Sequence, residues 1–448
     1  MLGKLKSLLK INESLSLMSN MAVAAFGFLS FMLLARTFSQ ETLGEWLLYL
    51  VPAGFMEMLR FAITKVSIVR FLSGAEGKER EALIGSNWLL GLLLTLIVIV
   101  LLLIVKFLFP EWIVSSGYYY FFTWYPLLAI FNLPFNNALG VLQADQKFQS
   151  VLTIRSTSTG LFFLFVLINF LFLNWSIERV VYAHLVANLL TSLLSIAKRW
   201  DGITHIFKAT KENNLKLFHF GKFTIGTMIG SNLLKSADTI LIGISPLGPA
   251  AVALYGVPLK LTEIMEIPLR SFLATAFPKM SKASLHNDND TVRKVFYTYS
   301  GAITLLFIPM IIVCIVFAKL FILILGGEQY ALEWTTVIIF QIFALYAFFL
   351  PIDRFTGVAL DSINKPKKNF YKVMVMASLN ILGDLIALYI FNSLIMVAVV
   401  TIIFTIIGQL IGFTYLNKEI PIKYREIFIH GYNFYLDLYN KKLKRSKR

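Results

Sequence analysis

The chain has 448 residues, of which 57% are hydrophobic and only 15% are charged. Soluble domains carry about 25% charged residues, so this composition excludes a soluble protein and predicts an integral membrane protein. The formal net charge of +16 does not indicate a nucleic-acid-binding groove, because the basic residues lie in loops between apolar segments. We therefore expect membrane lipids, and no nucleic acid, as partners.

Twelve apolar runs are long enough to be predicted as transmembrane helices. The first follows a short basic start and has no small-x-small cleavage site after it, so it is interpreted as an uncleaved first helix. The predicted helices cover residues 16–35, 46–69, 83–108, 119–142, 153–173, 177–197, 220–244, 250–276, 295–323, 332–353, 371–391 and 393–416. The predicted fold class is an all-α polytopic membrane protein.

Basic residues are concentrated in every second loop. The intervening loops hold only Arg36, Lys106 and Arg179. The rich loops and the N-terminal segment hold Lys4, Lys6, Lys10, Arg70, Lys78, Arg80, Lys147, Arg155, Lys198, Arg199, Lys208, Lys211, Lys216, Lys222, Lys279, Lys282, Arg293, Lys294, Arg354, Lys365, Lys367, Lys368 and Lys372. By the positive-inside rule, both termini are predicted to be cytoplasmic.

The predicted eighth helix, within residues 254–281, carries Lys260, Glu263, Glu266 and Arg270. At ~100° per residue, these four positions fall within about a third of the helix circumference. A charge near the bilayer centre costs at least ~2.5–3.5 kcal/mol, so such residues usually face a protein interior or a water-filled cavity. This helix is therefore predicted to line a transport pathway.

Other predicted helices also carry charged residues at membrane depth. They are Glu57, Arg60 and Lys65 in the second helix, Lys235 and Asp238 in the seventh, and Asp384 in the eleventh. Intramembrane charge is by default a functional hypothesis. The alternative is that these residues form internal ion pairs that hold helices together, and that Asp384 is a hydrogen-bonded packing residue.

The two halves of the chain resemble each other. Under a shift of 209 positions, LGEWLLYLVPAGFMEMLR (43–60) falls on VALYGVPLKLTEIMEIPL (252–269). Glu57 then meets Glu266, and Arg60 falls one position before Arg270. Both copies begin on the same side and contain six helices, which predicts a parallel repeat related by a pseudo-two-fold axis. The predicted domains are a six-helix lobe at 1–215, a second at 216–417, and a basic amphipathic cytoplasmic tail at 418–448.

Several stretches, in this order and spacing, resemble a known family. They are LARTFSQETLGEWLLYL near the start, GKFTIGTMIGSNLLKSADTILIGISPLGPAAVALYGVPLKLTEIMEIPLRSFLATAFPKMS in the middle, and ILGGEQYALEW and NKPKKNFYKV later. They are similar to the polysaccharide-repeat-unit flippases of the MOP exporter superfamily, the O-antigen type that carries lipid-linked oligosaccharides. The chain departs from the lipid II flippase branch, which typically has fourteen helices. It also departs from MATE drug exporters, because its first helix holds Asn20 and no carboxylate within the apolar run.

The resemblance implies two lobes around a MATE-like, V-shaped cavity that opens to alternate sides. It also implies a substrate: an oligosaccharide on undecaprenyl pyrophosphate, flipped from the cytoplasmic to the outer leaflet of the bacterial plasma (inner) membrane. Such a flippase serves surface polysaccharides such as lipopolysaccharide O-antigen or capsule. A polysaccharide polymerase is a candidate partner, and a monomer is expected because the cavity closes within one chain.

An anionic headgroup calls for cations, and arginine can bind a pyrophosphate through two donors. The substrate-binding candidates are Arg60, Lys65, Lys235, Lys260 and Arg270. The chain has no GxxxxGK[ST] motif, so a proton or sodium gradient is the hypothesis for the energy source. The ion-coupling candidates are Asp238, Glu263, Glu266 and Glu57, which are carboxylates at membrane depth, and Asp384 is a further buried acid.

Two other function classes were weighed. A cation-coupled drug or metabolite antiporter on the same scaffold predicts a cavity dominated by carboxylates. A membrane enzyme of envelope synthesis predicts a large outer loop with catalytic residues, whereas the outer loops here are short. No cofactor or metal site is expected, because the five histidines have no metal-ligand spacing with each other or with Cys314. The prediction is a secondary transporter, not an enzyme.

Overall fold

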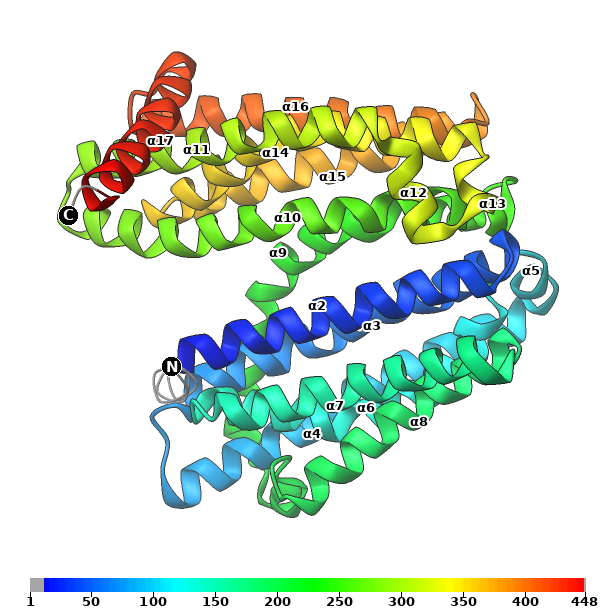
Figure 1. Ribbon diagram of the computed structural model, residues 1–448. Coiled ribbons are helices and arrows are strands. Elements are labelled where there is room, and N and C mark those ends of the chain that lie inside the picture. Colours follow the sequence, from blue (N-terminus) through cyan, green and yellow to red (C-terminus); the bar gives the residue numbers. More distant parts are fainter. Residues whose placement is uncertain (1–11, 447–448) are drawn as a thin grey trace. The chain divides into compact units, whose positions relative to one another are not determined.

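The structure is a computed structural model that describes residues 12–446, without the side chains of 12–19, 222–228, 231, 235, 438 and 441–446. Helices account for nearly all of this range (Figure 1). The chain divides into two compact units, each described separately below: unit 1 comprises residues 1–232 and 248–253, and unit 2 comprises residues 233–247 and 254–448. The domain boundary predicted between residues 215 and 216 stays a prediction.

Unit 1 is a bundle of long helices that run back and forth. Its helices are α2 (Asn12–Thr37), α3 (Gln40–Leu72), α4 (Gly77–Leu108), α5 (Pro110–Ser115), α6 (Tyr119–Ala144), α7 (Phe148–Ile168), the π-helix η1 (Asn169–Leu173), α8 (Ile177–Ala197), the 3-10 helix η2 (Ile203–Lys208) and the first part of α9 (Lys211–Ile244). Inside the unit, α2 packs on α7, and α6 packs on both α3 and α8.

Unit 2 repeats this arrangement with its own helices. They are the end of α9, most of α10 (Gly248–Leu285), α11 (Asn289–Val316), α12 (Ala318–Gly326), α13 (Glu328–Ala331), α14 (Trp334–Ser362), α15 (Pro366–Tyr389), α16 (Leu394–Glu419) and α17 (Tyr424–Ser446). Here α14 packs on α11 and α16, and α15 packs on α16. Buried aromatic side chains such as Phe296, Phe307 and Phe355 form much of its core.

Local sequence explains where several helices begin. Ser39 accepts a hydrogen bond from the Thr42 amide at 3.3 Å and caps α3. Asp288 accepts one from the Thr291 amide at 2.9 Å and caps α11. Such caps satisfy amides that have no partner within the helix.

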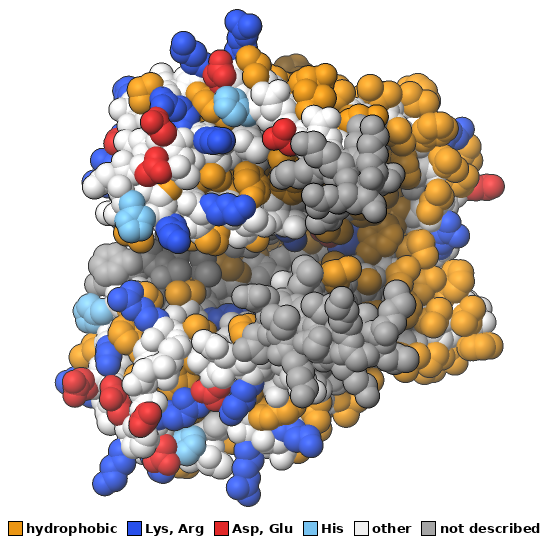
Figure 2. All heavy atoms as spheres, turned by 60° about the vertical axis from the view of Figure 1, so that its left-hand side comes forward, with side chains coloured by type: hydrophobic (Ala, Val, Ile, Leu, Met, Phe, Trp, Pro, Cys, Tyr) orange, Lys and Arg blue, Asp and Glu red, His pale blue; other side chains and the backbone are white. Residues whose placement is uncertain are grey.

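Ten helices among the described residues are long and apolar enough to cross a membrane. They correspond to ten of the twelve predicted spans. The other two, α9 and α10, are equally long, and α10 carries the four charged residues noted above. Figure 2 shows charged side chains gathered over one end of the helices and hydrophobic side chains along their flanks, as expected for helices surrounded by lipid.

Two sequence predictions about individual segments are wrong. The span predicted at 295–323 is interrupted at Phe317, where α11 ends and α12 begins. Arg354 was placed after the predicted span 332–353 but lies inside α14, which continues to Ser362. The prediction failed because Arg354 lies about two turns from a helix end that is rich in polar residues, where hydropathy does not mark the boundary.

A matched pair of glycine contacts supports the repeat. In unit 1, a Cβ at Gly85 of α4 would collide with the His205 carbonyl oxygen in η2. In unit 2, a Cβ at Gly301 of α11 would collide with the Ile427 carbonyl oxygen in α17. In each unit the segment after the sixth long helix therefore crosses the third at backbone contact, and only glycine permits this approach.

Candidate functional site

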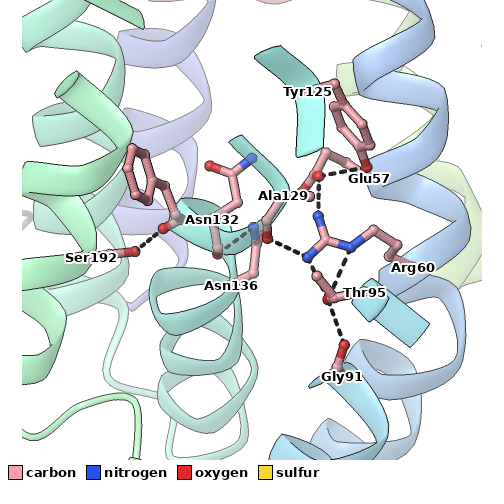
Figure 3. Close-up of polar contacts among 10 residues, drawn as sticks. Glu57, Arg60, Gly91, Thr95, Tyr125, Ala129, Asn132, Asn136 and Ser192 are labelled. Carbon is pink, nitrogen blue, oxygen red and sulfur yellow. Dashed lines mark hydrogen bonds and ion pairs between the residues drawn. The ribbon is translucent and has the colours of Figure 1, made fainter. Parts of the chain in front are cut away.

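A buried arginine joins three helices of unit 1 (Figure 3). Arg60 of α3 is only 1% exposed and forms an ion pair with Glu57, one turn earlier. Its remaining donors reach Thr95 of α4, at 2.7 and 3.2 Å, and the Ala129 carbonyl of α6, at 2.6 Å. The Tyr125 hydroxyl of α6 donates to the same Glu57 oxygen at 2.9 Å. The guanidinium therefore has no exposed surface left for a ligand.

Two further cations in unit 1 lie together without an acidic partner. Lys65 follows Arg60 on α3 by about one and a half turns and is half-buried. It lies within electrostatic range of Arg155 on α7. Arg155 donates to the Asn20 side-chain oxygen of α2 at 2.6 Å. Among the described residues, neither cation forms an ion pair, so this cationic pair can accept an anion.

Two buried carboxylates lie close together in unit 2. Asp238 of α9 is 6% exposed and Asp384 of α15 is fully buried. The Asn380 amide connects the two carboxylates, donating to each at 3.0 Å. Asp238 also accepts from the Tyr255 hydroxyl of α10 and, at 3.4 Å, from Thr401 of α16. Four helices thus supply one polar cluster.

This cluster has the composition of a cation site. Two buried carboxylates this close repel each other unless they share a proton or bind a cation. Among the residues whose side chains are described, neither has a cationic partner, and one side-chain oxygen each of Asn380 and Asp384 accepts no hydrogen bond. Carboxylate, amide and hydroxyl oxygens are the ligands that hard cations prefer. The cluster could therefore hold a proton or a sodium ion.

A cavity of about 130 Å³ within unit 2 reaches this cluster. Asp238 and Thr401 line it together with Glu263, Glu266 and Arg270 of α10, and with Tyr346, Asp353 and Arg354 of α14. The volume has room for several water molecules. The cavity therefore gives a hydrated cation a polar path to Asp238, and it places two arginines on the same path.

The charges of α10 pair with each other along the helix. Lys260 lies 2.7 Å from Glu263, and Arg270 lies 2.5 Å from Glu266. Both members of each pair belong to α10. Exposed pairs of this kind contribute at most about 1 kcal/mol, so a ligand can replace one partner at little cost.

Arg354 is a polar residue of the cavity that the sequence interpretation missed. Its guanidinium lies against the Tyr346 hydroxyl and within electrostatic range of Glu266 and Asp353. Asp353 itself is buried and paired with Lys372 of α15 at 2.9 Å. Arg354 therefore shares Glu266 with Arg270, and each arginine could instead contact an anionic ligand. The sequence did contain a sign that Arg354 lies within a helix, because Asp353 and Arg354 directly follow an apolar run.

The structure thus separates the predicted site residues into distinct groups. Glu57 and Arg60 belong to the buried network of unit 1, and Lys65 faces Arg155 instead. In unit 2, Glu263, Glu266 and Arg270 line the cavity that reaches Asp238. Lys260 pairs with Glu263 but is not itself one of the residues that line the cavity. The side chain of Lys235 lies outside the described residues. Asn380, Thr401 and Tyr255 were missed, although a buried polar residue in an apolar helix is itself a signal.

A sequence model of the polysaccharide biosynthesis proteins matches residues 10–284, more than half of the chain. The chain belongs to the polysaccharide biosynthesis protein family. A model of the MatE family also matches residues 224–386 of this family member. The flippase Agl15 of Haloferax volcanii, a probable low-salt glycan biosynthesis flippase, is 22% identical over 248 residues. Those residues are 55% of this chain and 51% of Agl15, so the match spans about half the length of that relative.

Solved transporters share the fold of this family member. The lipid II flippase MurJ, in an inward closed conformation, superposes with a TM-score of 0.73 at 17% identity, over 96% of this chain and 92% of that one. An inward-facing multidrug resistance MATE transporter gives 0.74 at 13% identity, over 89% and 94%. The predicted fold of two six-helix lobes is confirmed. Together with the ten long apolar helices, these neighbours support a multi-pass membrane protein.

Proposed function

We propose that this transporter flips a lipid-linked oligosaccharide and is driven by a cation gradient. The observation that carries the proposal is the cavity in unit 2, where arginines suited to phosphate and carboxylates suited to a cation line one space. The family match and the glycan flippase Agl15 support a glycan substrate. A cation bound at Asp238 and Asp384 would change the electrostatic potential at the arginines. Binding of the cation and binding of the anionic substrate would therefore be coupled.

In this proposal the carrier is undecaprenyl pyrophosphate, and the repeat unit moves outward by alternating access in the bacterial inner membrane. Both termini are cytoplasmic, and a monomer suffices for transport. The product is a surface polysaccharide such as O-antigen or capsule, and a polysaccharide polymerase is the candidate partner that uses the flipped repeat units. In unit 2, Arg270 and Arg354 contact the phosphates at the cavity, and Lys260 keeps its predicted substrate role. In unit 1, Lys65 and Arg155 form a separate candidate contact for phosphate. Lys235 remains a candidate from the sequence. Glu57 and Arg60 take a structural role instead of the coupling and binding roles predicted for them.

Reconstituted transport tests the proposal. Purified protein in liposomes would translocate a fluorescent lipid-pyrophosphate oligosaccharide faster under an imposed sodium or proton gradient. Replacing Arg354 or Arg155 by Gln should slow translocation about tenfold each, because each removes a charge-assisted contact to phosphate. Lys294→Gln is the matched control, since this cation lies near the start of α11 and outside the cavity lining. Full activity of both arginine variants, or transport unaffected by collapsing both gradients, would contradict the proposal.

A second candidate is a cation-coupled drug or metabolite antiporter, which the MatE match over residues 224–386 favours. The same liposomes distinguish the two functions. An antiporter would exchange a soluble organic cation against the gradient and leave the lipid-linked oligosaccharide in place. In that case the arginine variants would have little effect, whereas Asp238→Asn would still abolish transport.

A further inference from the structure

Helix α17 is attached to unit 2 along one face. Gly431 of α17 meets Gly301 of α11 at backbone contact. The Tyr435 hydroxyl donates to the Ala302 carbonyl at 2.8 Å, and the Lys423 amide donates to the Tyr297 hydroxyl at 2.7 Å. The attachment is therefore specific and uses the first half of the helix.

The opposite face of α17 presents a second apolar stripe. Ile429, Tyr432, Leu436 and Tyr439 are between 38% and 63% exposed. Their spacing of three, four and three residues places them on one side of the helix. The packed residues Ile427 and Gly431 lie on the other side. A helix that only had to pack against α11 would carry polar residues at the stripe positions.

The corresponding segment of unit 1 shows how little the packing itself requires. There the 3-10 helix η2 makes the equivalent contact with Gly85 and comprises only six residues. Helix α17 has 23 residues. Most of its length, and all of its exposed stripe, are therefore available for another role.

The direction and depth of α17 suit a membrane interface. Figure 1 shows α17 crossing the long helices of its unit instead of running along them. A span of about 20 residues crosses the hydrocarbon core, and counted back from the end of α11 at Val316 it reaches Tyr297. The contact at Gly301 therefore lies close to the edge of the hydrocarbon. An interfacial amphipathic helix lies in this plane and at this depth.

The basic residues near the exposed apolar stripe indicate that an anionic surface covers it. Arg425 lies on the same side of the helix as the stripe, and the chain ends in KKLKRSKR. Each basic residue near an anionic leaflet raises membrane affinity about fivefold. We propose that α17 lies in the headgroup layer of an anionic leaflet, with Ile429, Tyr432, Leu436 and Tyr439 inserted toward the acyl chains. The helix then anchors the first half of α11 to the membrane surface, whatever the transported substrate.

Labelling tests this proposal in the full-length protein. Cys314, the chain's single cysteine, is first replaced by Ala, and a single cysteine is then introduced by Tyr432→Cys or, as the control, Asn433→Cys. Asn433 is also exposed but lies about 100° around the helix. Each variant carries an environment-sensitive fluorophore and is reconstituted with phosphatidylcholine, alone or with anionic phosphatidylglycerol. Quenching is compared between lipid-bound nitroxide and aqueous iodide.

The expected result is a several-fold higher ratio of lipid to aqueous quenching at position 432 than at 433, and a higher ratio with phosphatidylglycerol. Replacing Lys441, Lys442, Lys444 and Arg445 by Gln should remove the dependence on phosphatidylglycerol. Equal iodide access at both positions would overturn the proposal by showing a solvated face. Protection of position 432 from both quenchers would overturn it in favour of a protein partner or a second copy of the chain.

Discussion

The polar cores of the two units differ in which charged groups lack a partner of opposite charge among the described side chains. In unit 1 the buried arginine is balanced by Glu57. We call Lys65 and Arg155 its excess cations, because neither has an acidic partner among the described residues. In unit 2 the buried lysine is balanced by Asp353. The excess carboxylates are Asp238 and Asp384, which have no cationic partner among the residues whose side chains are described. A repeat that duplicates a fold also duplicates positions for buried charge. The difference between the copies indicates which positions stabilise the fold and which remain for ligands.

The largest expected effect concerns the balanced pair of unit 1. Arg60→Met leaves Glu57 in a buried site without its cation, which should destabilise the protein by about 3–5 kcal/mol. Lys65→Met is the matched control on the same helix, and it should change stability little because no ion pair is lost. Thermal unfolding in detergent, followed by tryptophan fluorescence, measures both variants.

A double variant sharpens this comparison. Glu57→Gln combined with Arg60→Met removes both charges, so it should recover part of the stability that Arg60→Met loses. If Lys65→Met destabilises as much as Arg60→Met, the distinction between a balanced pair and excess cations fails. Unchanged thermal stability of Arg60→Met would remove the structural role proposed for this arginine.

The second effect concerns the excess carboxylates of unit 2. A cation that binds only the folded state at a hundred times its Kd stabilises it by about 2.7 kcal/mol. Sodium chloride should therefore raise the Tm of the native protein relative to choline chloride. Asp384→Asn should abolish this increase without lowering the Tm in choline chloride, because it also removes a repulsion between buried acids.

The control for this variant is another buried acid of the same unit. Asp353→Asn breaks the pair with Lys372 and should lower the Tm, yet it should leave the sodium-dependent increase intact. A native protein that responds to pH and not to sodium would identify the coupling ion as a proton. Asp384→Asn with an undiminished sodium response would show that the carboxylate pair is not the cation site.

The sequence predicted the fold better than the site. Hydropathy and loop charge were enough for twelve long helices, because every helix exposed to lipid must satisfy its backbone internally and be apolar outside. They failed at Phe317, where an apolar chain breaks between α11 and α12 and Lys319 is the single charged residue close to the break. Polar residues near helix ends, such as Arg354, also cannot be distinguished from loop residues by composition.

Which charges are paired was not predictable, because pairing depends on contacts between distant helices. Glu57 and Arg60 are three positions apart, as are Lys260 and Glu263. Arg60 is buried and bonded to two other helices, whereas Glu263 is 55% exposed. Asp384 was interpreted as either a coupling acid or a packing residue. The structure places it beside Asp238, 146 positions earlier. No spacing rule within one helix could reveal that pair.

The smallest expected effect concerns the segments that close each unit after its sixth long helix. In unit 1 this segment contains Asp201, which is 1% exposed, and burial raises the pKa of its carboxyl to about 6 from the ordinary value of 3.8. In unit 2 the residues leading into α17 include the buried Ile420 and Ile422 instead. The closing segment of unit 1 should therefore respond to mild acid through Asp201.

The sign of that response follows from proton binding. Between pH 4 and 6 the folded protein holds a proton on Asp201 that the unfolded chain has released, so stability should fall as pH rises through this window and level off above it. We expect a change of about 1 kcal/mol after allowance for solvent screening. Hydrogen exchange of residues 203–208 at pH 4.5 and 7 measures it locally, and Asp201→Asn should remove the difference. A slope that persists in Asp201→Asn would assign the titration to another group and leave the two closing segments alike.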